Sequence, residues 1–196
     1  MASNPIELFT SEEYLVMERA ARYKSEYIDG EIVAIVGASE PHNLIVTNIV
    51  GELSVQLRGR PCRVYASDMR VDVRETGLYA YPDVVALCGE PILSEDAQDN
   101  LRNPSVIIEV LSSSTEAYDR GKKFMKYRRI ESLMEYVLVA QDKTHVEHYV
   151  RQTNGGWLLS ESTTLDDEIH LSSIDCRIKL STIYDKVAIS GALIRT

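Results

Sequence analysis

Two acidic residues occupy positions where the sequence otherwise predicts buried strands. Asp83 follows Pro82 and begins the apolar run 84–87, and Glu109 lies inside the apolar run 106–111. A carboxylate buried in such a strand costs free energy unless it is paired with a charge or bound to a cation. Glu109 has apolar neighbours on both sides, so neither strand face would place it among polar residues. These two carboxylates are the first candidates for a functional site.

A basic segment after Glu109 adds a second group of charged residues. Asp119, Lys123 and Tyr127 are spaced at i, i+4 and i+8, so they share one face of the helix predicted over 113–129. This helix follows the Glu109 strand after a short serine-rich turn. We therefore expect its first turns to lie near the C-terminal end of that strand.

Each feature also has a structural explanation, which the sequence leaves open. Asp83 could be a turn residue at the start of a strand, and Glu109 could form an ion pair with a buried arginine or lysine. Asp119 and Lys123 suit an i,i+4 ion pair on a solvated helix face, worth about 0.2–0.5 kcal/mol. The joint occurrence of the features favours a functional site.

The elements that position these residues follow from hydrophobic spacing and turn signals. Capping boxes at Thr10–Glu13 and Ser113–Glu116 predict helices over 10–22 and 113–129. Apolar residues that recur every four positions predict a helix over 41–58, and a short final helix is predicted over 182–188. Apolar runs predict strands over 63–66, 69–73, 81–87, 105–111, 135–140, 145–150 and 157–160, with hairpin turns at Asp29-Gly30 and 154–156. The runs at 81–87 and 105–111 predict central strands buried on both faces. The order predicts an α/β or α+β fold with a mixed sheet, and the length of 196 residues predicts one domain over 1–196.

Composition bounds the location and the partners. No apolar run approaches the roughly 18 residues that span a membrane, and residues 1–9 lack a secretory signal, which predicts a cytoplasmic protein. The formal net charge of −9 counts against nucleic-acid binding, although it does not describe local patches. The three cysteines, Cys62, Cys88 and Cys176, lack the pattern of a disulfide framework or a zinc site, so we interpret them as small buried apolar residues.

Several motifs, in this order, resemble the Uma2 family of restriction endonucleases in the PD-(D/E)XK nuclease superfamily. They are Tyr-Pro-Asp-Val-Val at 81–85, Pro-Ser-Val-Ile-Ile-Glu-Val-Leu-Ser at 104–112, Asp-x-x-x-Lys-x-x-x-Tyr at 119–127 and Glu-Tyr-Val-Leu-Val at 135–139. The upstream Glu-Tyr-Ile-Asp-Gly-Glu at 26–31 and the helix that contains His42 are also similar. The resemblance covers nearly the whole chain and implies a restriction-endonuclease-like core, a mixed central sheet flanked by helices.

The resemblance also implies the roles of individual residues. Asp83 and Glu109 would bind the metal together with the Val110 carbonyl oxygen, and Glu26, on or just after the first helix, would be a further acidic site residue. The superfamily pattern has a lysine two residues after the glutamate, where this chain has Leu111. In this family the lysine has moved to the following helix, at the position of Lys123.

The activity implied is Mg²⁺-dependent hydrolysis of DNA phosphodiester bonds, with Mn²⁺ as an alternative cation. Lys123 would orient the attacking water or stabilise the pentavalent phosphate. Lys126 or Tyr127 would contact a flanking phosphate, and His42 would lie near the site as a further substrate-binding residue. A homodimer is expected by symmetry if both strands are cut.

Two alternatives come from other functional classes. The first is a catalytically inactive nucleic-acid- or protein-binding module on the same fold, which the net charge and Leu111 favour. The second is a zinc hydrolase with ligands from His42, His145, His148 and His170. Because His145 and His148 are three apart in a predicted strand, they point to opposite faces, which argues against zinc.

Overall fold

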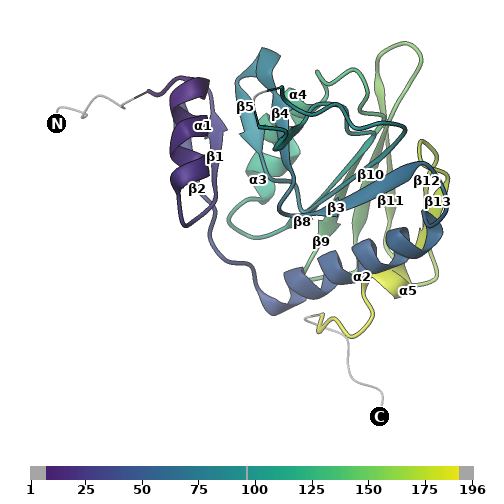
Figure 1. Ribbon diagram of the computed structural model, residues 1–196. Helices are drawn as coiled ribbons and strands as arrows, with labels where there is room; N and C mark the ends of the chain where they lie inside the picture. Colours follow the sequence, from purple (N-terminus) through teal and green to yellow (C-terminus); the bar gives the residue numbers. More distant parts are fainter. Residues whose placement is uncertain (1–7, 96, 190–196) are drawn as a thin grey trace.

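The structure of the protein is a computed structural model that describes residues 8–95 and 97–189 (Figure 1). Its helices are α1 (Ser11–Ala20), α2 (Glu40–Gln56), α3 (Glu116–Tyr118), α4 (Phe124–Tyr127) and α5 (Leu180–Ile183), with a 3-10 turn η1 (Arg74–Thr76) and a π-helical turn η2 (Asp119–Lys123). Its strands are β1 (Ser25–Ile28), β2 (Glu31–Ala34), β3 (Cys62–Ala66), β4 (Arg70–Val73), β5 (Leu78–Ala80), β6 (Val84–Cys88), β7 (Asn100–Leu101), β8 (Val106–Leu111), β9 (Glu135–Ala140), β10 (Val146–Arg151), β11 (Trp157–Ser162), β12 (Glu168–Leu171) and β13 (Cys176–Lys179). The absence of a secretory signal is predicted from residues 1–9, and of these, residues 1–7 lie outside the described part. Residues 190–196 of the predicted domain also lie outside it.

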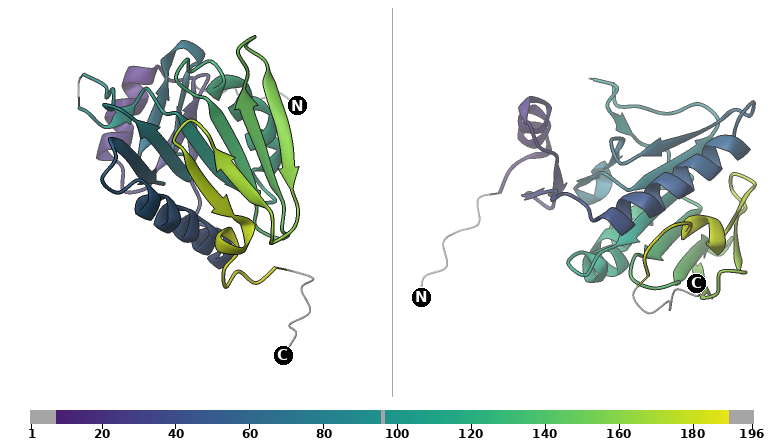
Figure 2. Two further views of the ribbon diagram at one scale, coloured as in Figure 1. Left: turned by 90° about the vertical axis from the view of Figure 1, so that its right-hand side faces the viewer. Right: turned by 90° about the horizontal axis from the view of Figure 1, so that it is seen from below.

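A six-stranded mixed sheet lies at the centre, in the order β11-β10-β9-β8-β6-β3. Strands β8 and β9 are parallel, and their other neighbours in this sheet are antiparallel. Side chains alternate across β8: Ile108 and Val110 pack against α2 and the β12–β13 hairpin, whereas Ile107 and Leu111 pack against α4. The ribbon views show α2 and this hairpin lying against the sheet (Figures 1 and 2). Both faces are covered, as predicted for this strand.

A second sheet, ordered β2-β1-β5-β4-β7, packs on the α4 side of the first. Its β1–β2 hairpin turns at Asp29 and Gly30, whose φ angles of 53° and 95° are those that an Asp-Gly turn requires. The hairpin prediction is confirmed. This sheet brings β1 toward the helical segment that follows β8, since Ile28 of β1 and Phe124 of α4 belong to one apolar cluster.

The predicted helices are present, with three differences. The final helix, predicted over 182–188, is found earlier, as α5 at Leu180–Ile183. Thr10 forms the predicted capping box with Glu13, and α2 buries the predicted stripe that includes Ile45 and Ile49. The second capping box is wrong, because the helix begins after Thr115 and no side chain caps it. The helix also contains the π-helical turn η2, which the sequence did not predict. Such turns occur often at functional sites.

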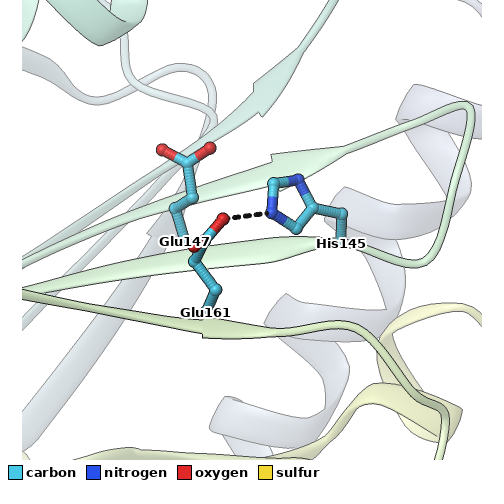
Figure 3. Close-up of side chains that lie close together, drawn as sticks. All are labelled: His145, Glu147 and Glu161. Atoms are coloured by element: carbon cyan, nitrogen blue, oxygen red, sulfur yellow. Dashed lines mark hydrogen bonds and ion pairs between the residues drawn. The ribbon is translucent and has the colours of Figure 1, made fainter.

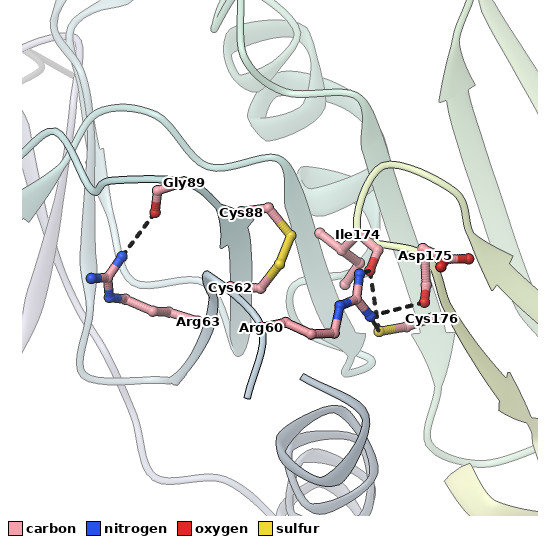
Figure 4. Close-up of a disulfide and its surroundings, with 8 residues drawn as sticks. All are labelled: Arg60, Cys62, Arg63, Cys88, Gly89, Ile174, Asp175 and Cys176. Carbon is pink, nitrogen blue, oxygen red and sulfur yellow. Dashed lines mark hydrogen bonds between the residues drawn. A yellow bond between two sulfur atoms is a disulfide. The ribbon is translucent and has the colours of Figure 1, made fainter. Parts of the chain in front are cut away.

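A disulfide joins Cys62 and Cys88, which corrects our interpretation of the cysteines (Figure 4). The antiparallel pairing of β3 and β6 places the two residues directly opposite each other, with their Cα atoms 3.9 Å apart. Because 26 residues separate them in sequence, only the strand register reveals the pair. Cys176 is buried and free, as predicted.

Among residues 8–95 and 97–189, no helix is long and apolar enough to cross a membrane.

Candidate metal centre

Asp83 and Glu109 lie side by side on neighbouring strands. Val84 pairs with Ile108 in the antiparallel β6–β8 ladder, so the residue before β6 faces Glu109. The Val110 N–H donates to Asp83 Oδ2 at 2.8 Å, and the Asp83 N–H donates to Glu109 Oε2 at 3.4 Å. Two carboxylates from distant parts of the sequence therefore meet at one point of the central sheet.

The Lys123 ammonium joins these carboxylates from the helical segment above the sheet. Its Nζ lies 3.0 Å from Glu109 Oε1, 3.0 Å from Glu26 Oε1 and 3.6 Å from Asp119 Oδ1. Only 6 % of the Lys123 side chain is exposed, so these carboxylates, rather than water, compensate the ammonium charge. The π-helical turn η2 contains both Asp119 and Lys123 and presents them to the sheet.

Glu26 reaches the cluster from β1, the strand that follows α1. Its carboxylate accepts a hydrogen bond from the Tyr81 N–H at 3.2 Å, and the side chain is buried. The pairing of Tyr27 with Tyr79 holds β1 beside β5, just before the segment that leads to Asp83. The second sheet thus supplies one carboxylate of the cluster.

His42 contributes an imidazole from the first turn of α2. Its Nε2 lies 3.2 Å from Asp83 Oδ2, on the same oxygen that accepts the Val110 N–H. Its Nδ1 is buried and has no hydrogen-bond partner among the described residues. The Ser39 side chain caps α2 by accepting a hydrogen bond from the His42 N–H, and this bond fixes the backbone position from which the imidazole extends.

Tyr127 joins the cluster as a partner of Glu109. Its hydroxyl donates to Glu109 Oε1 at 3.2 Å, and its side chain is fully buried. Lys126 does not join: its Nζ lies 2.5 Å from Asp29 Oδ1 and also contacts the Thr76 carbonyl. We therefore leave Lys126 out of the proposed substrate contacts.

The structure adds two residues to the group that the sequence singled out. Asp119 was noted for its helical spacing but not assigned to the site, and its buried carboxylate faces Lys123. Tyr118 was missed, because a tyrosine in a helix gives no signal of its own. Its ring lies 5.8 Å from Lys123 Nζ, and its buried hydroxyl has no hydrogen-bond partner within residues 8–95 and 97–189.

The cluster carries more negative than positive charge. Burial raises the pKa of Glu109 well above its usual range; Lys123 opposes the rise, and Asp119, Asp83 and Glu26 add to it. Burial also raises the pKa of Asp119, again against the effect of Lys123. For Lys123 itself, burial favours a lower pKa, but the surrounding acidic groups outweigh it and raise the pKa well above its usual value. Burial is thus the largest cause of the raised pKa of the two carboxyl groups, and the neighbouring carboxylates add to it, whereas for Lys123 the acidic neighbours outweigh burial.

The donor set suits a hard divalent cation. When all the groups are ionised, the carboxylates of Glu26, Glu109 and Asp119 face the single ammonium of Lys123, and the Asp83 N–H joins Asp83 to the other oxygen of Glu109. Carboxylate oxygens are the ligands that Mg²⁺ and Mn²⁺ prefer. Val110 enters the cluster through its N–H, and the role of its carbonyl oxygen as a ligand stays a prediction.

A cleft of about 330 Å³ opens at the C-terminal ends of β8 and β9. Leu111 and Ser112 line it two and three residues after Glu109, and Pro41 lines it next to His42. The cleft is therefore adjacent in sequence to two members of the cluster, on two different elements. Its lining is mixed polar and apolar, with Lys143 as its basic residue.

Another group of potential ligands lies on the β10–β11 hairpin: His145, Glu147 and Glu161, whose nearest ligand atoms lie within 4.8 Å of one another (Figure 3). His145 Nε2 is 2.9 Å from Glu161 Oε1. Glu147 is already bonded to the Arg120 guanidinium and to the Tyr149 hydroxyl. Because these side chains already have partners, we interpret this group as a cross-strand ion-pair network.

Sequence comparison identifies relatives over nearly the whole chain. Residues 11–181 match the Uma2 family, which is described as "Putative restriction endonuclease". The uncharacterized protein sll1609 of Synechocystis is 40 % identical over 165 residues, 84 % of this chain and 93 % of that protein. The uncharacterized protein slr1290 of the same organism is 34 % identical over 186 residues, 95 % of this chain and 96 % of that protein. The chain belongs to the Uma2 family, as its motifs predicted.

Comparison of structures confirms the fold class. The crystal structure of a "putative nuclease belonging to DUF820" from Anabaena variabilis superposes with a TM-score of 0.76 and 19 % sequence identity. The match covers 92 % of this chain and 99 % of the other. The mixed sheets with flanking helices are therefore a fold that the two proteins share.

Proposed function

We propose that this member of the Uma2 family is a Mg²⁺-dependent endonuclease that hydrolyses phosphodiester bonds of DNA, with Mn²⁺ as an alternative cation. The observation that carries the proposal is the position of Glu109 between Asp83 and Lys123. The Asp83 N–H donates to Glu109 Oε2, the Val110 N–H donates to the Asp83 carboxylate, and Lys123 Nζ lies 3.0 Å from Glu109 Oε1. The family description as a restriction endonuclease supports DNA as the substrate.

Asp83 and Glu109, with the Val110 carbonyl oxygen, would hold the cation. A divalent cation bound there supplies Lewis-acid stabilisation of the charge that builds on the phosphate and lowers the pKa of water. The backbone donors fix the two carboxylates before any ligand arrives, because Asp83 accepts from the Val110 N–H and Glu109 faces the Asp83 N–H. Such preorganisation avoids the cost of reorienting charged groups during the reaction.

Lys123 would act as a fixed positive charge. Its carboxylate partners raise its pKa, so it stays protonated and is no general base at neutral pH. A permanent ammonium beside the phosphate would stabilise negative charge that develops in the transition state. The amine at this position would thus serve in place of the lysine that Leu111 replaces.

His42 would orient Asp83 and need not touch the DNA. Its Nε2 lies against the carboxylate oxygen that also accepts the Val110 N–H. A partner of this kind fixes the direction of a ligand oxygen and tunes its basicity. The substrate contact predicted for Tyr127 is replaced by its bond to Glu109.

Two further parts of the proposal concern assembly and location. A homodimer would place two such clusters opposite the two strands of a duplex, which is the arrangement that double-strand cleavage needs. Access to chromosomal or foreign DNA fits a cytoplasmic location.

The second candidate is a non-catalytic binding module on the same fold. The net charge of −9 and the Leu111 position favour it. Such a module would bind a nucleic acid or a protein without breaking a phosphodiester bond. Electrophoretic mobility shifts without product formation would support this alternative.

Cleavage of supercoiled plasmid DNA tests the proposed activity. We expect nicked and linear products with Mg²⁺ or Mn²⁺, no products with a chelator, and none from Asp83→Ala or Glu109→Ala. Glu161→Gln is the matched control, since this exposed glutamate lies outside the cluster. Equal activity in Asp83→Ala, Glu109→Ala and the wild type would rule out this site.

A further inference from the structure

The Lys123 ammonium is enclosed by groups that bind cations. We call this set the ammonium cage: the carboxylates of Glu26, Glu109 and Asp119, at 3.0, 3.0 and 3.6 Å from Nζ, and the rings of Tyr118 and Tyr127, at 5.8 and 5.9 Å. Aromatic faces at this range attract an ammonium ion, most strongly where water is excluded. The cage is therefore built for a positive charge, and the chain itself supplies that charge.

Glu109 divides the cluster into two parts. Its Oε1 faces Lys123 Nζ and the Tyr127 hydroxyl, so this oxygen belongs to the cage. Its Oε2 accepts from the Asp83 N–H and so faces Asp83. One carboxylate thus borders two cation positions, as bridging ligands do in sites for two metal ions.

The cage holds more carboxylates than one ammonium requires in a simple pair. Glu26 and Asp119 lie on β1 and η2, so two separate elements bring them to the same Nζ. Both side chains are buried, where an unpaired carboxylate is costly. Without the ammonium, these groups would need another cation in its place.

We propose that the Lys123 ammonium occupies the position of a second cation, so the protein binds a single divalent cation, on the Asp83 side of Glu109. Glu26 and Asp119 then serve the ammonium and are not ligands of the metal ion. The inference rests on the proposed function, because it assumes that Asp83 and Glu109 bind a cation. It goes further in that it assigns the stoichiometry and the role of Asp119.

The inference predicts what happens when the ammonium is removed. Lys123→Ala leaves three carboxylates and two rings around an empty volume open to solutes. A second divalent cation can enter this volume and bridge to the first through Glu109. A small organic ammonium ion can enter it too, since the rings and carboxylates already fit an ammonium.

Isothermal titration of the full chain with Mn²⁺ tests the inference. We expect one bound ion per chain in the wild type and two in Lys123→Ala. Methylammonium should compete with the second ion in Lys123→Ala and leave the first in place. The matched control is Lys126→Ala, which removes a buried lysine of α4 that pairs with Asp29 outside the cage and should bind one ion.

The outcomes separate this inference from the proposed function. Two ions in the wild type would overturn the inference and leave the proposed metal site intact. No bound ion in the wild type would overturn the metal site and the inference with it. One ion in a Lys123→Ala protein whose circular dichroism is native would overturn the inference alone. Should Lys123→Ala fail to fold, the wild-type stoichiometry alone decides, one ion in support and two against.

Discussion

Two reciprocal hydrogen bonds fix the carboxylates of Asp83 and Glu109 relative to each other. The N–H of Val110, the residue after Glu109, donates to the Asp83 carboxylate at 2.8 Å, and the Asp83 N–H donates to the Glu109 carboxylate at 3.4 Å. This reciprocal contact makes the relative position of the two carboxylates a property of the β6–β8 ladder. It therefore depends little on side-chain flexibility, which is what a preformed cation site requires.

The reciprocal contact predicts that charge and geometry can be separated at Asp83. Asp83→Asn keeps an oxygen that accepts the Val110 N–H but removes the charge that would bind the cation. We expect thermal unfolding close to that of the wild type, with Mn²⁺ affinity and plasmid cleavage both reduced by at least about 100-fold, or about 2.7 kcal/mol. Calorimetric titration and a plasmid assay on the same preparation measure this. Native affinity in Asp83→Asn would show that its carboxylate is not a ligand.

A second prediction concerns His42 as a positioning residue. Its Nε2 lies 3.2 Å from Asp83 Oδ2, so its removal frees the orientation of a proposed ligand without removing the ligand. We expect His42→Ala to weaken Mn²⁺ binding by about 10–100-fold, as partners of ligands commonly do. His170→Ala, on β12, is the control and should bind Mn²⁺ like the wild type. If His42→Ala and His170→Ala bind Mn²⁺ with equal affinity, His42 does not position a metal ligand and serves only in packing.

The two tyrosines of the cage offer a matched pair for stability. The Tyr127 hydroxyl donates to Glu109, whereas the buried Tyr118 hydroxyl has no hydrogen-bond partner in the part of the chain that the structure describes. Tyr127→Phe should therefore lower the free energy of unfolding by about 0.5–1.5 kcal/mol, and Tyr118→Phe should leave it unchanged or raise it slightly. Urea unfolding at neutral pH measures both. A larger loss in Tyr118→Phe than in Tyr127→Phe would contradict the hydrogen bonding described.

Much of this site follows from the sequence, for a physical reason. Asp83 and Glu109 stand out because a carboxylate inside an apolar strand needs compensation, and that requirement is local in sequence. Lys123 stands out because helical spacing places it on one face with Asp119. The Asp29-Gly30 turn can be predicted for a similar reason, since few residue pairs adopt the positive φ angles that it requires.

The remaining features depend on register and on tertiary contacts. The Cys62–Cys88 disulfide requires the β3–β6 register, which no local pattern encodes. Glu26 reaches the site only because β1 pairs with β5 in a second sheet. Lys126 illustrates the reverse, since its sequence context resembles that of Lys123 but its amine lies at the hairpin turn beside Asp29.

The disulfide gives a prediction about stability under reducing conditions. Closing a loop between cysteines 26 residues apart restricts the unfolded chain, which stabilises the folded state by about 3 kcal/mol. We expect a reductant to lower the urea midpoint of the wild type and to have no effect on the Cys62→Ser/Cys88→Ser double variant. The double variant should match the reduced wild type. A wild-type midpoint that does not respond to reductant, with the thiols shown to be free, would refute the estimate.

The pH dependence of stability should carry the signature of Glu135, a buried carboxylate outside the proposed site. Burial favours a higher pKa of Glu135, but hydrogen bonds with His148 at 2.5 Å and from the Ser173 N–H at 2.7 Å outweigh it, so the folded-state pKa is lowered. A lowered folded pKa means that the folded state binds the proton less readily than the unfolded state, whose pKa is about 4.3. The stabilisation is therefore fully present above that unfolded pKa and is lost as the pH falls through the folded pKa.

Glu135→Gln should remove this dependence. At neutral pH the variant should be less stable than the wild type by about 1–3 kcal/mol, because it loses a charge-assisted hydrogen bond in a buried position. The difference should shrink as the pH falls from about 5 toward 3, where the wild-type carboxylate takes up its proton. Urea unfolding across this range measures it, with exposed Glu161→Gln as the control. A difference that stays constant with pH would show that the stabilisation does not come from the charged form of Glu135.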